Sequence, residues 1–75
     1  MTTKYIAWCK KEYLNLADYT ILDCMLDCVG EGVGDSVQDR FTAQTSPIIY
    51  QDENYIVTED PDGYCYLLEI VVAAT

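Results

Sequence analysis

Residues 21–40 carry a four-residue repeat, ILDC-MLDC-VGEG-VGDS-VQDR, with an apolar residue first and an acidic residue third in each unit. In a β-strand these two positions would share one face, and carboxylates would be buried against the core at high cost. In a helix they separate, because residues four apart stay on one side. The repeat therefore predicts helix, with a line of exposed acids formed by Asp23, Asp27, Glu31, Asp35 and Asp39.

Three glycines interrupt this repeat at positions 30, 32 and 34. Each costs about 1 kcal/mol relative to alanine in a helix interior. We therefore expect a helix over residues 16–29, with Asn15 as its N-cap and Asp18 at N3. A bent or interrupted stretch at the glycines then leads to a further turn or two of helix ending near Arg40.

Residues 46–72 predict three antiparallel strands. Ser46-Pro47 ends the helical region, because the residue before proline is disfavoured in the α conformation. Strands are expected at residues 48–51, 55–59 and 64–72, with polar turns at 52–54 and 60–63. Residues 3–13 fit either a strand or a helix, and the aromatic and β-branched residues at positions 5–8 favour a strand.

These elements predict an α+β fold of one domain, residues 1–75. The order β-α-β-β-β gives a small two-layer domain, an antiparallel sheet of three to four strands packed against one helix, straight or bent at its glycines. The last strand is mostly apolar on both faces, so one face would be exposed in a monomer with two layers. Homodimerisation through Cys65, Leu67 and Val71 is one interpretation, and cover by the N-terminal segment or by a curl of the sheet is the alternative.

The charge of the chain favours a positively charged partner. Thirteen acids against four bases give a net charge of −9, without any histidine. Complementary charge steers association with basic proteins, whereas binding to nucleic acid or an anionic membrane requires clustered Lys and Arg. The predicted helix carries one charge per about 6 Å, against one per about 1.7 Å in duplex DNA. Imitation of nucleic acid would therefore need the acids near the turns as well: Asp52, Glu53, Glu59, Asp60 and Asp62.

No motif for catalysis, a cofactor or a metal accompanies this charge. Histidine, the usual general base, is missing, and the carboxylates of the turns have little around them to raise a pKa. The 60–63 turn does not match a calcium loop, because its glycine falls at the wrong position. The four cysteines, Cys9, Cys24, Cys28 and Cys65, are expected to be small buried residues, with a disulfide such as Cys9–Cys65 or a four-cysteine metal site as alternatives.

The sequence thus predicts a non-enzymatic acidic module that docks onto a basic protein surface which normally holds nucleic acid. In its small size, acidity and tyrosine content it is similar to phage-encoded inhibitors, including DNA mimics and anti-CRISPR proteins; no family motif is matched, so no residue role is carried over. Short apolar stretches and the lack of a signal-peptide pattern favour the cytoplasm, that of the host if a phage encodes the protein. A structural homo-oligomer with acids serving solubility is the first alternative, and a small acidic enzyme or metal-binding domain the second.

Overall fold

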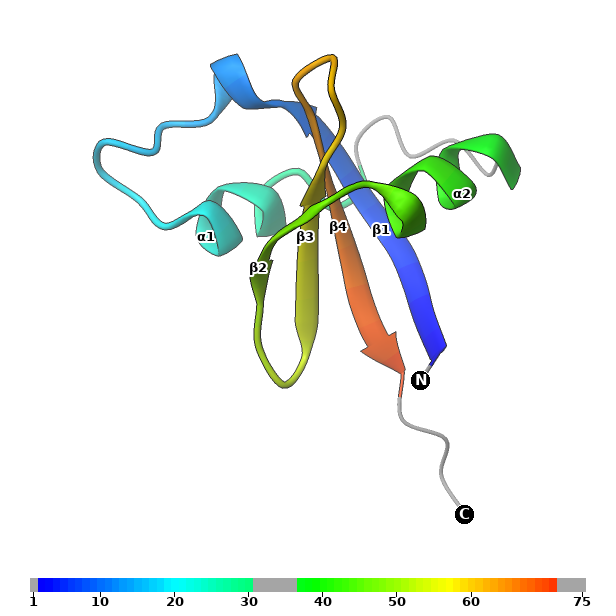
Figure 1. Ribbon diagram of the computed structural model, residues 1–75. Helices are drawn as coiled ribbons and strands as arrows, with labels where there is room; N and C mark the ends of the chain where they lie inside the picture. The colour runs from blue at the N-terminus through cyan, green and yellow to red at the C-terminus, as the bar shows by residue number, and fades with distance from the viewer. Residues whose placement is uncertain (1, 31–36, 72–75) are drawn as a thin grey trace.

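The computed structural model describes residues 2–30 and 37–71, which form a four-stranded antiparallel sheet and two α-helices (Figure 1). The strands are β1 Thr2–Lys10, β2 Ile48–Gln51, β3 Tyr55–Glu59 and β4 Tyr64–Val71. They lie in the order β1-β4-β3-β2. The predicted α+β class and the antiparallel arrangement are confirmed, and the ambiguous N-terminal segment is a strand.

The strands β2, β3 and β4 form the predicted meander, and β1 pairs with β4 along the other side. The register runs from Thr2 opposite Val71 to Lys10 opposite Tyr64, with an irregularity between Tyr5 and Ala7. Gly63 ends the turn between β3 and β4 with a φ of 88°. This left-handed conformation is disfavoured for residues with a Cβ, which is why the turn needs glycine there.

The first helix differs from the prediction. Helix α1 covers Ile21–Leu26, and its N-cap is Thr20, whose side chain accepts a hydrogen bond of 3.1 Å from the Asp23 N–H. Asn15 instead donates to Asp18 within the preceding loop, where residues 15–20 are all exposed. A short helix is stabilised mainly by packing of its apolar face. Residues 16–20 lack that packing, so the expected start at residue 16 is wrong.

A second helix, α2, covers Val37–Thr45. It extends past Arg40, so the end expected there is wrong, and it stops directly before Ser46-Pro47, as predicted from the proline. Figure 1 shows α1 and α2 on opposite sides of the sheet. Met25 of α1 packs in a cluster with Cys65 and Leu67, whereas Ala43 of α2 packs with Tyr66 and Leu68. Because neighbouring residues of a strand point to opposite faces, each helix covers one face of β4. Two short helices, one per face, thus replace the single helix expected on one face.

A buried hydrogen bond joins α2 to the sheet. The hydroxyl of Thr58, which is 1% exposed, donates to the carbonyl of Ala43 over 2.7 Å. In a regular helix that carbonyl would accept from the N–H of residue 47, but Pro47 has none. The Thr58 hydroxyl therefore satisfies a carbonyl that the proline would otherwise leave buried without a partner.

Replacement of Thr58 by Val is expected to lower the free energy of unfolding by about 1 to 3 kcal/mol, because the buried Ala43 carbonyl loses its donor. Urea denaturation monitored by circular dichroism measures this change. Thr45→Val is the matched control, since the Thr45 hydroxyl bonds to the Phe41 carbonyl in an exposed position. The control should change stability by less than about 0.5 kcal/mol; equal effects of the two substitutions would contradict the assigned role of Thr58.

Candidate partner-binding surface

The five predicted helical acids do not form one line. Asp23 lies on α1 and Asp27 is its C-cap residue, and both are exposed. Asp39 is exposed in the first turn of α2, on the other side of the sheet. Glu31 and Asp35 lie outside the described residues. Asp23 and Asp39 therefore do not share one line, because they lie on separate helices that cover opposite faces of the sheet (Figure 1). Most of the stretch at the glycines, where a bend or interruption was expected, lies outside the described residues.

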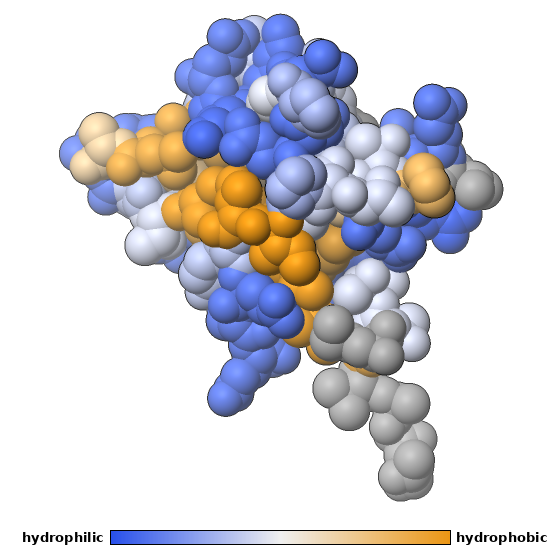
Figure 2. Space-filling view, in the orientation of Figure 1, coloured by the Kyte–Doolittle hydropathy of each residue, from blue (hydrophilic) through white to orange (hydrophobic). Residues whose placement is uncertain are grey.

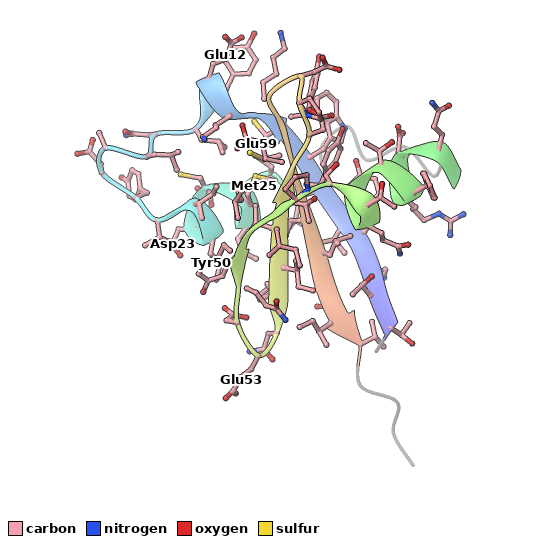
Figure 3. The ribbon with its side chains drawn as sticks, viewed as in Figure 1. Glu12, Asp23, Met25, Tyr50, Glu53 and Glu59 are labelled. Carbon is pink, nitrogen blue, oxygen red and sulfur yellow. The ribbon has the colours of Figure 1, made fainter. Side chains whose placement is uncertain are left out.

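The structure instead brings Asp23 close to the β2–β3 turn. The Tyr50 hydroxyl of β2 donates to the Asp52 carboxylate over 2.7 Å. This hydrogen bond raises the pKa of Tyr50, and desolvation and the negative charges of Asp52 and Asp23 act in the same direction. Figure 3 shows Asp23 and Tyr50 as neighbours and Glu53 at the end of the hairpin. Three predicted acids, Asp23, Asp52 and Glu53, thus surround β2.

Asp52 also organises the turn that carries Glu53. One oxygen of its carboxylate accepts hydrogen bonds of 2.7 Å from the N–H groups of Asn54 and Tyr55. The hydrogen bond from Tyr50, followed by these two backbone bonds, lowers the pKa of Asp52. The carboxylate is therefore ionised and held in place at neutral pH, while Glu53 is exposed beside it.

Two exposed isoleucines form the first two residues of β2, the strand that leads into the turn with Asp52 and Glu53. Ile48 is 56% exposed and Ile49 is 41% exposed on this edge strand. Figure 2 shows an apolar patch over β2 with hydrophilic residues along its borders. An exposed apolar patch with a polar rim is typical of a protein–protein interface. We call this edge of the sheet the β2 surface. It consists of Ile48, Ile49 and Tyr50 of β2, of Asp52 and Glu53 in the turn that follows, and of Asp23 of α1, whose charge acts on Tyr50.

Sequence reasoning missed the two isoleucines as site residues, although it predicted their strand. Their exposure depends on the position of β2 at the edge of the sheet, which follows from the strand order. The available signal was the short length of the strand and the proline before it, since both features are common at sheet edges.

The remaining predicted acids belong to other parts of the molecule. Asp60 accepts hydrogen bonds from the Tyr66 hydroxyl at 2.7 Å and from the N–H groups of Asp62 and Tyr64 at 3.0 Å. Burial, followed by the hydrogen bond to Asp60, raises the pKa of Tyr66, to which the charge of Asp39 also contributes. Asp39 and Asp60 therefore lie near one tyrosine on the α2 side, and Asp62 is exposed at the β3–β4 turn.

Tyr5 completes this second acidic region. Its ring meets that of Tyr66 edge-on, with centroids 6.1 Å apart. Burial, and to a lesser extent the charge of Asp39, raise the pKa of Tyr5 to about 12. Of the predicted acids, Asp23 and Asp52 thus lie near Tyr50, whereas Asp39 and Asp60 lie near Tyr66.

The residues expected to form an oligomer interface are mostly buried within the chain. Cys65 and Leu67 are both 0% exposed and pack in the cluster that contains Met25 of α1. The expectation of an exposed face at these two positions is wrong, because α1 covers it. Val71, at the end of β4, is 41% exposed.

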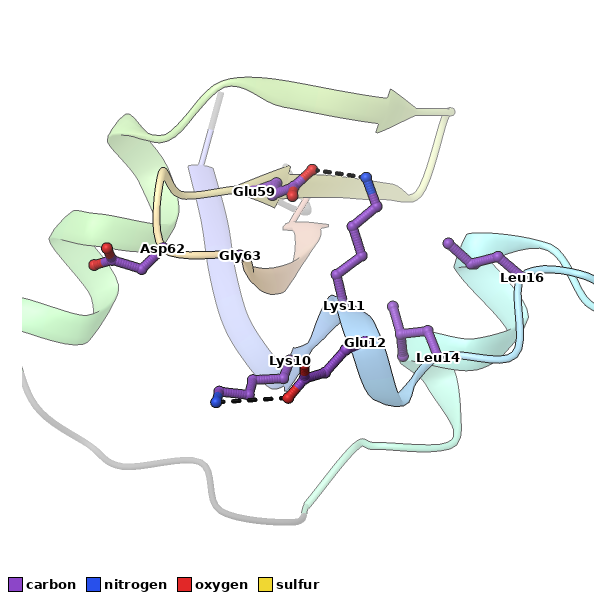
Figure 4. Close-up of a pocket in the computed structure, with 8 residues that line it drawn as sticks. All are labelled: Lys10, Lys11, Glu12, Leu14, Leu16, Glu59, Asp62 and Gly63. Carbon is purple, nitrogen blue, oxygen red and sulfur yellow. Dashed lines mark hydrogen bonds and ion pairs between the residues drawn. The ribbon is translucent and has the colours of Figure 1, made fainter.

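A surface pocket of about 510 Å³ lies where the 3₁₀ turn η1, Lys11–Tyr13, meets the β3–β4 turn (Figure 4). Its two lysines are paired with acids, Lys10 with Glu12 at 3.6 Å and Lys11 with Glu59 at 3.2 Å. Among the described residues no group of three or more His, Cys, Asp and Glu side chains is placed to hold a metal ion.

Within residues 2–30 and 37–71, no helix is long and apolar enough to cross a membrane. Comparisons with protein-family models, curated proteins and solved structures find no match.

Proposed function

We propose that the protein is a non-enzymatic module that binds a basic protein through the β2 surface. The observation that carries this proposal is the exposure of two isoleucines, Ile48 and Ile49, on an edge strand that leads into the acidic turn of Asp52 and Glu53. Apolar anchors inside a polar rim are the usual arrangement of a protein interface. The partner is expected to place an apolar contact against the isoleucines and Lys or Arg side chains against the carboxylates.

The charge of the whole chain supports a basic partner. A net charge of −9 on 75 residues produces a field that speeds encounter with a positive surface and slows encounter with a negative one. Basic surfaces of this kind normally hold nucleic acid. We therefore propose that the module acts as an inhibitor that competes with nucleic acid for its partner, in the manner of a DNA mimic.

This inhibitor role suits a phage-encoded protein that acts in the host cytoplasm, as anti-CRISPR and other anti-defence proteins do. On the β2 side, the mimicry of nucleic acid depends on Asp23, Asp52 and Glu53. Asp39 of α2 lies on the opposite face of the sheet from Asp23 of α1 (Figure 1). Asp39, Asp60 and Asp62 contribute to the long-range field rather than to the contact. The homo-oligomer alternative has less support, because two of its three expected interface residues, Cys65 and Leu67, are buried in the core of the chain.

The proposal predicts that apolar and acidic substitutions weaken binding in different ways. The partner is first captured from cells of the source organism, with nuclease present, and purified. Ile48→Ser and Ile49→Ser should each weaken its binding by roughly tenfold without changing the salt dependence. The double variant Asp23→Asn/Glu53→Gln should weaken binding and also flatten the salt dependence, because it removes rim charges. Affinities measured by calorimetry at several salt concentrations test both expectations.

The control variant is Asp39→Asn/Asp62→Asn, which removes the same number of charges from positions outside the β2 surface. It should lower the association rate slightly and leave the dissociation rate unchanged. Duplex DNA should compete with the wild-type protein for the partner. Equal effects of the two double variants, or binding that is indifferent to salt and to DNA, would overturn the proposal.

A further inference from the structure

Cys9 and Cys65 lie directly opposite each other on neighbouring strands. The register of β1 and β4 pairs Cys9 with Cys65, between the pairs Trp8–Tyr66 and Lys10–Tyr64. Both side chains belong to the apolar cluster under α1. All four cysteines are thiols in this structure, Cys65 buried and Cys9 half-buried. The reactive atoms of two residues far apart in the chain are thus on the same face of adjacent strands.

This pairing is compatible with the geometry of a disulfide. Opposite residues in an antiparallel pair have Cα atoms about 4.5 or 5.5 Å apart. Disulfides span Cα separations of about 4.4 to 6.8 Å, so the backbone can remain in place. Cβ atoms of such pairs are about 4.5 to 5.5 Å apart, against about 3.8 Å on average in a disulfide. The two side chains therefore need to approach by roughly 1 Å.

We propose that Cys9 and Cys65 are a site of reversible thiol–disulfide exchange with a small disulfide such as oxidised glutathione. The half-buried Cys9 loses its proton, and its thiolate attacks one sulfur of glutathione disulfide, releasing one glutathione thiolate. The Cys65 thiolate then attacks the Cys9 sulfur of the mixed disulfide and releases the second glutathione. Two protein thiols are oxidised, one glutathione disulfide is reduced to two thiols, and the two protein protons pass to the released glutathione.

The surroundings of the two cysteines explain this order of attack. Burial, with a smaller effect of the nearby Glu59 charge, raises the pKa of Cys65 to about 11. Cys65 is therefore slow to form the thiolate that starts exchange, and it is out of reach of glutathione. Once Cys9 carries the mixed disulfide, Cys65 has its target on the adjacent strand and needs no access from solvent.

The other two cysteines are placed differently. The Cys24 thiol donates to the Asn15 carbonyl, and the Cys28 thiol donates to the Cys24 carbonyl. Both bonds direct the sulfur toward local backbone around α1. The Cys9–Cys65 disulfide, by contrast, would join β1 to β4 just before η1 and just after the β3–β4 turn, and would close a loop that spans most of the chain.

The test is a titration of the folded full-length protein with mixtures of reduced and oxidised glutathione, followed by peptide mapping under non-reducing conditions. We expect an intramolecular link between the peptides that contain Cys9 and Cys65, reversible by dithiothreitol. The melting temperature of the oxidised protein should be higher by roughly 10 °C, because the link restricts the unfolded chain.

Two variants decide the assignment. Cys9→Ser changes a half-buried position and should abolish the link, leaving Cys65 reduced. The double variant Cys24→Ser/Cys28→Ser should form the link as the wild-type protein does. The proposal is overturned if the folded wild-type protein stays fully reduced in oxidised glutathione, if Cys9→Ser forms as much intramolecular disulfide, or if the link maps to Cys24 and Cys28.

Discussion

Leu67→Asp is expected to unfold the protein instead of separating an oligomer into monomers. Leu67 is 0% exposed and packs with Met25 and Val57 between β4 and α1. An unpaired carboxylate in that position, together with the lost apolar contacts, costs at least about 4 kcal/mol. A domain of this size has a total stability of about 4 to 11 kcal/mol. Circular dichroism should show loss of the cooperative thermal transition, or a midpoint lowered by tens of degrees.

Val71→Asp is the matched control on the same strand, at a position that is 41% exposed. It should change stability by less than about 1 kcal/mol and keep the native spectrum. A Leu67→Asp variant that melts like the wild-type protein, with a smaller mass in sedimentation, would show that Leu67 is at an oligomer interface and that its burial under α1 is wrong.

Asp60→Ala is expected to give the second largest loss of stability. The Asp60 carboxylate accepts hydrogen bonds from the Tyr66 hydroxyl and from the Asp62 and Tyr64 N–H groups. Alanine removes all three bonds and leaves two part-buried donors, the Tyr64 N–H and the Tyr66 hydroxyl, and the exposed Asp62 N–H without this acceptor. Since solvent compensates part of this loss, we expect a decrease of about 2 to 3 kcal/mol in the free energy of unfolding, measured by urea denaturation.

The same carboxylate makes stability depend on pH. Desolvation by itself raises the pKa of Asp60, but the hydrogen bonds from Tyr66, Tyr64 and Asp62 outweigh it and hold the pKa below its ordinary value of 3.8. A group with a lowered pKa in the folded state stabilises the fold fully above its unfolded pKa. That contribution is lost as the pH falls through the folded pKa. The difference in stability between wild type and Asp60→Ala should therefore shrink below about pH 4.

Asp62→Ala serves as the control for Asp60→Ala, because Asp62 is exposed in the same turn and its carboxylate carries the same charge. It should change stability by less than about 0.5 kcal/mol at neutral pH. If the two variants lost equal stability, or if the advantage of wild type over Asp60→Ala did not decrease as the pH falls below about 4, the hydrogen bonds of Asp60 would not be the cause.

The strands were predictable because their signals are local. Pro47 starts the extended region, and β2 and β3 begin and end at the predicted residues. The turn at residues 60–63 follows from its Asp, Pro and Gly, and Gly63 has the positive φ that this chemistry indicates. Each of these signals acts within a few residues, so it does not depend on the rest of the fold.

The helices were only partly predictable, since packing decides how far each one extends. The four-residue repeat correctly predicts helix around Asp23 and Asp39. The repeat begins at Ile21, as α1 does, whereas the start at residue 16 expected from Asn15 and Asp18 is wrong, because that loop is exposed and has no core to pack against. The repeat does not reveal that α2 reaches Thr45, where the Thr58 hydroxyl satisfies the Ala43 carbonyl left by Pro47.

The sequence by itself determined the α+β class, the strands and turns, and a strongly acidic surface, because composition and local backbone preferences specify them. The tertiary structure decided which residues share a surface. Packing α1 and α2 on opposite faces buried Leu67 and placed Asp23 and Asp39 on different sides of the sheet, and the edge position of β2 left Ile48 and Ile49 exposed. These outcomes depend on strand order and on contacts between residues distant in the chain, about which a local pattern carries no information.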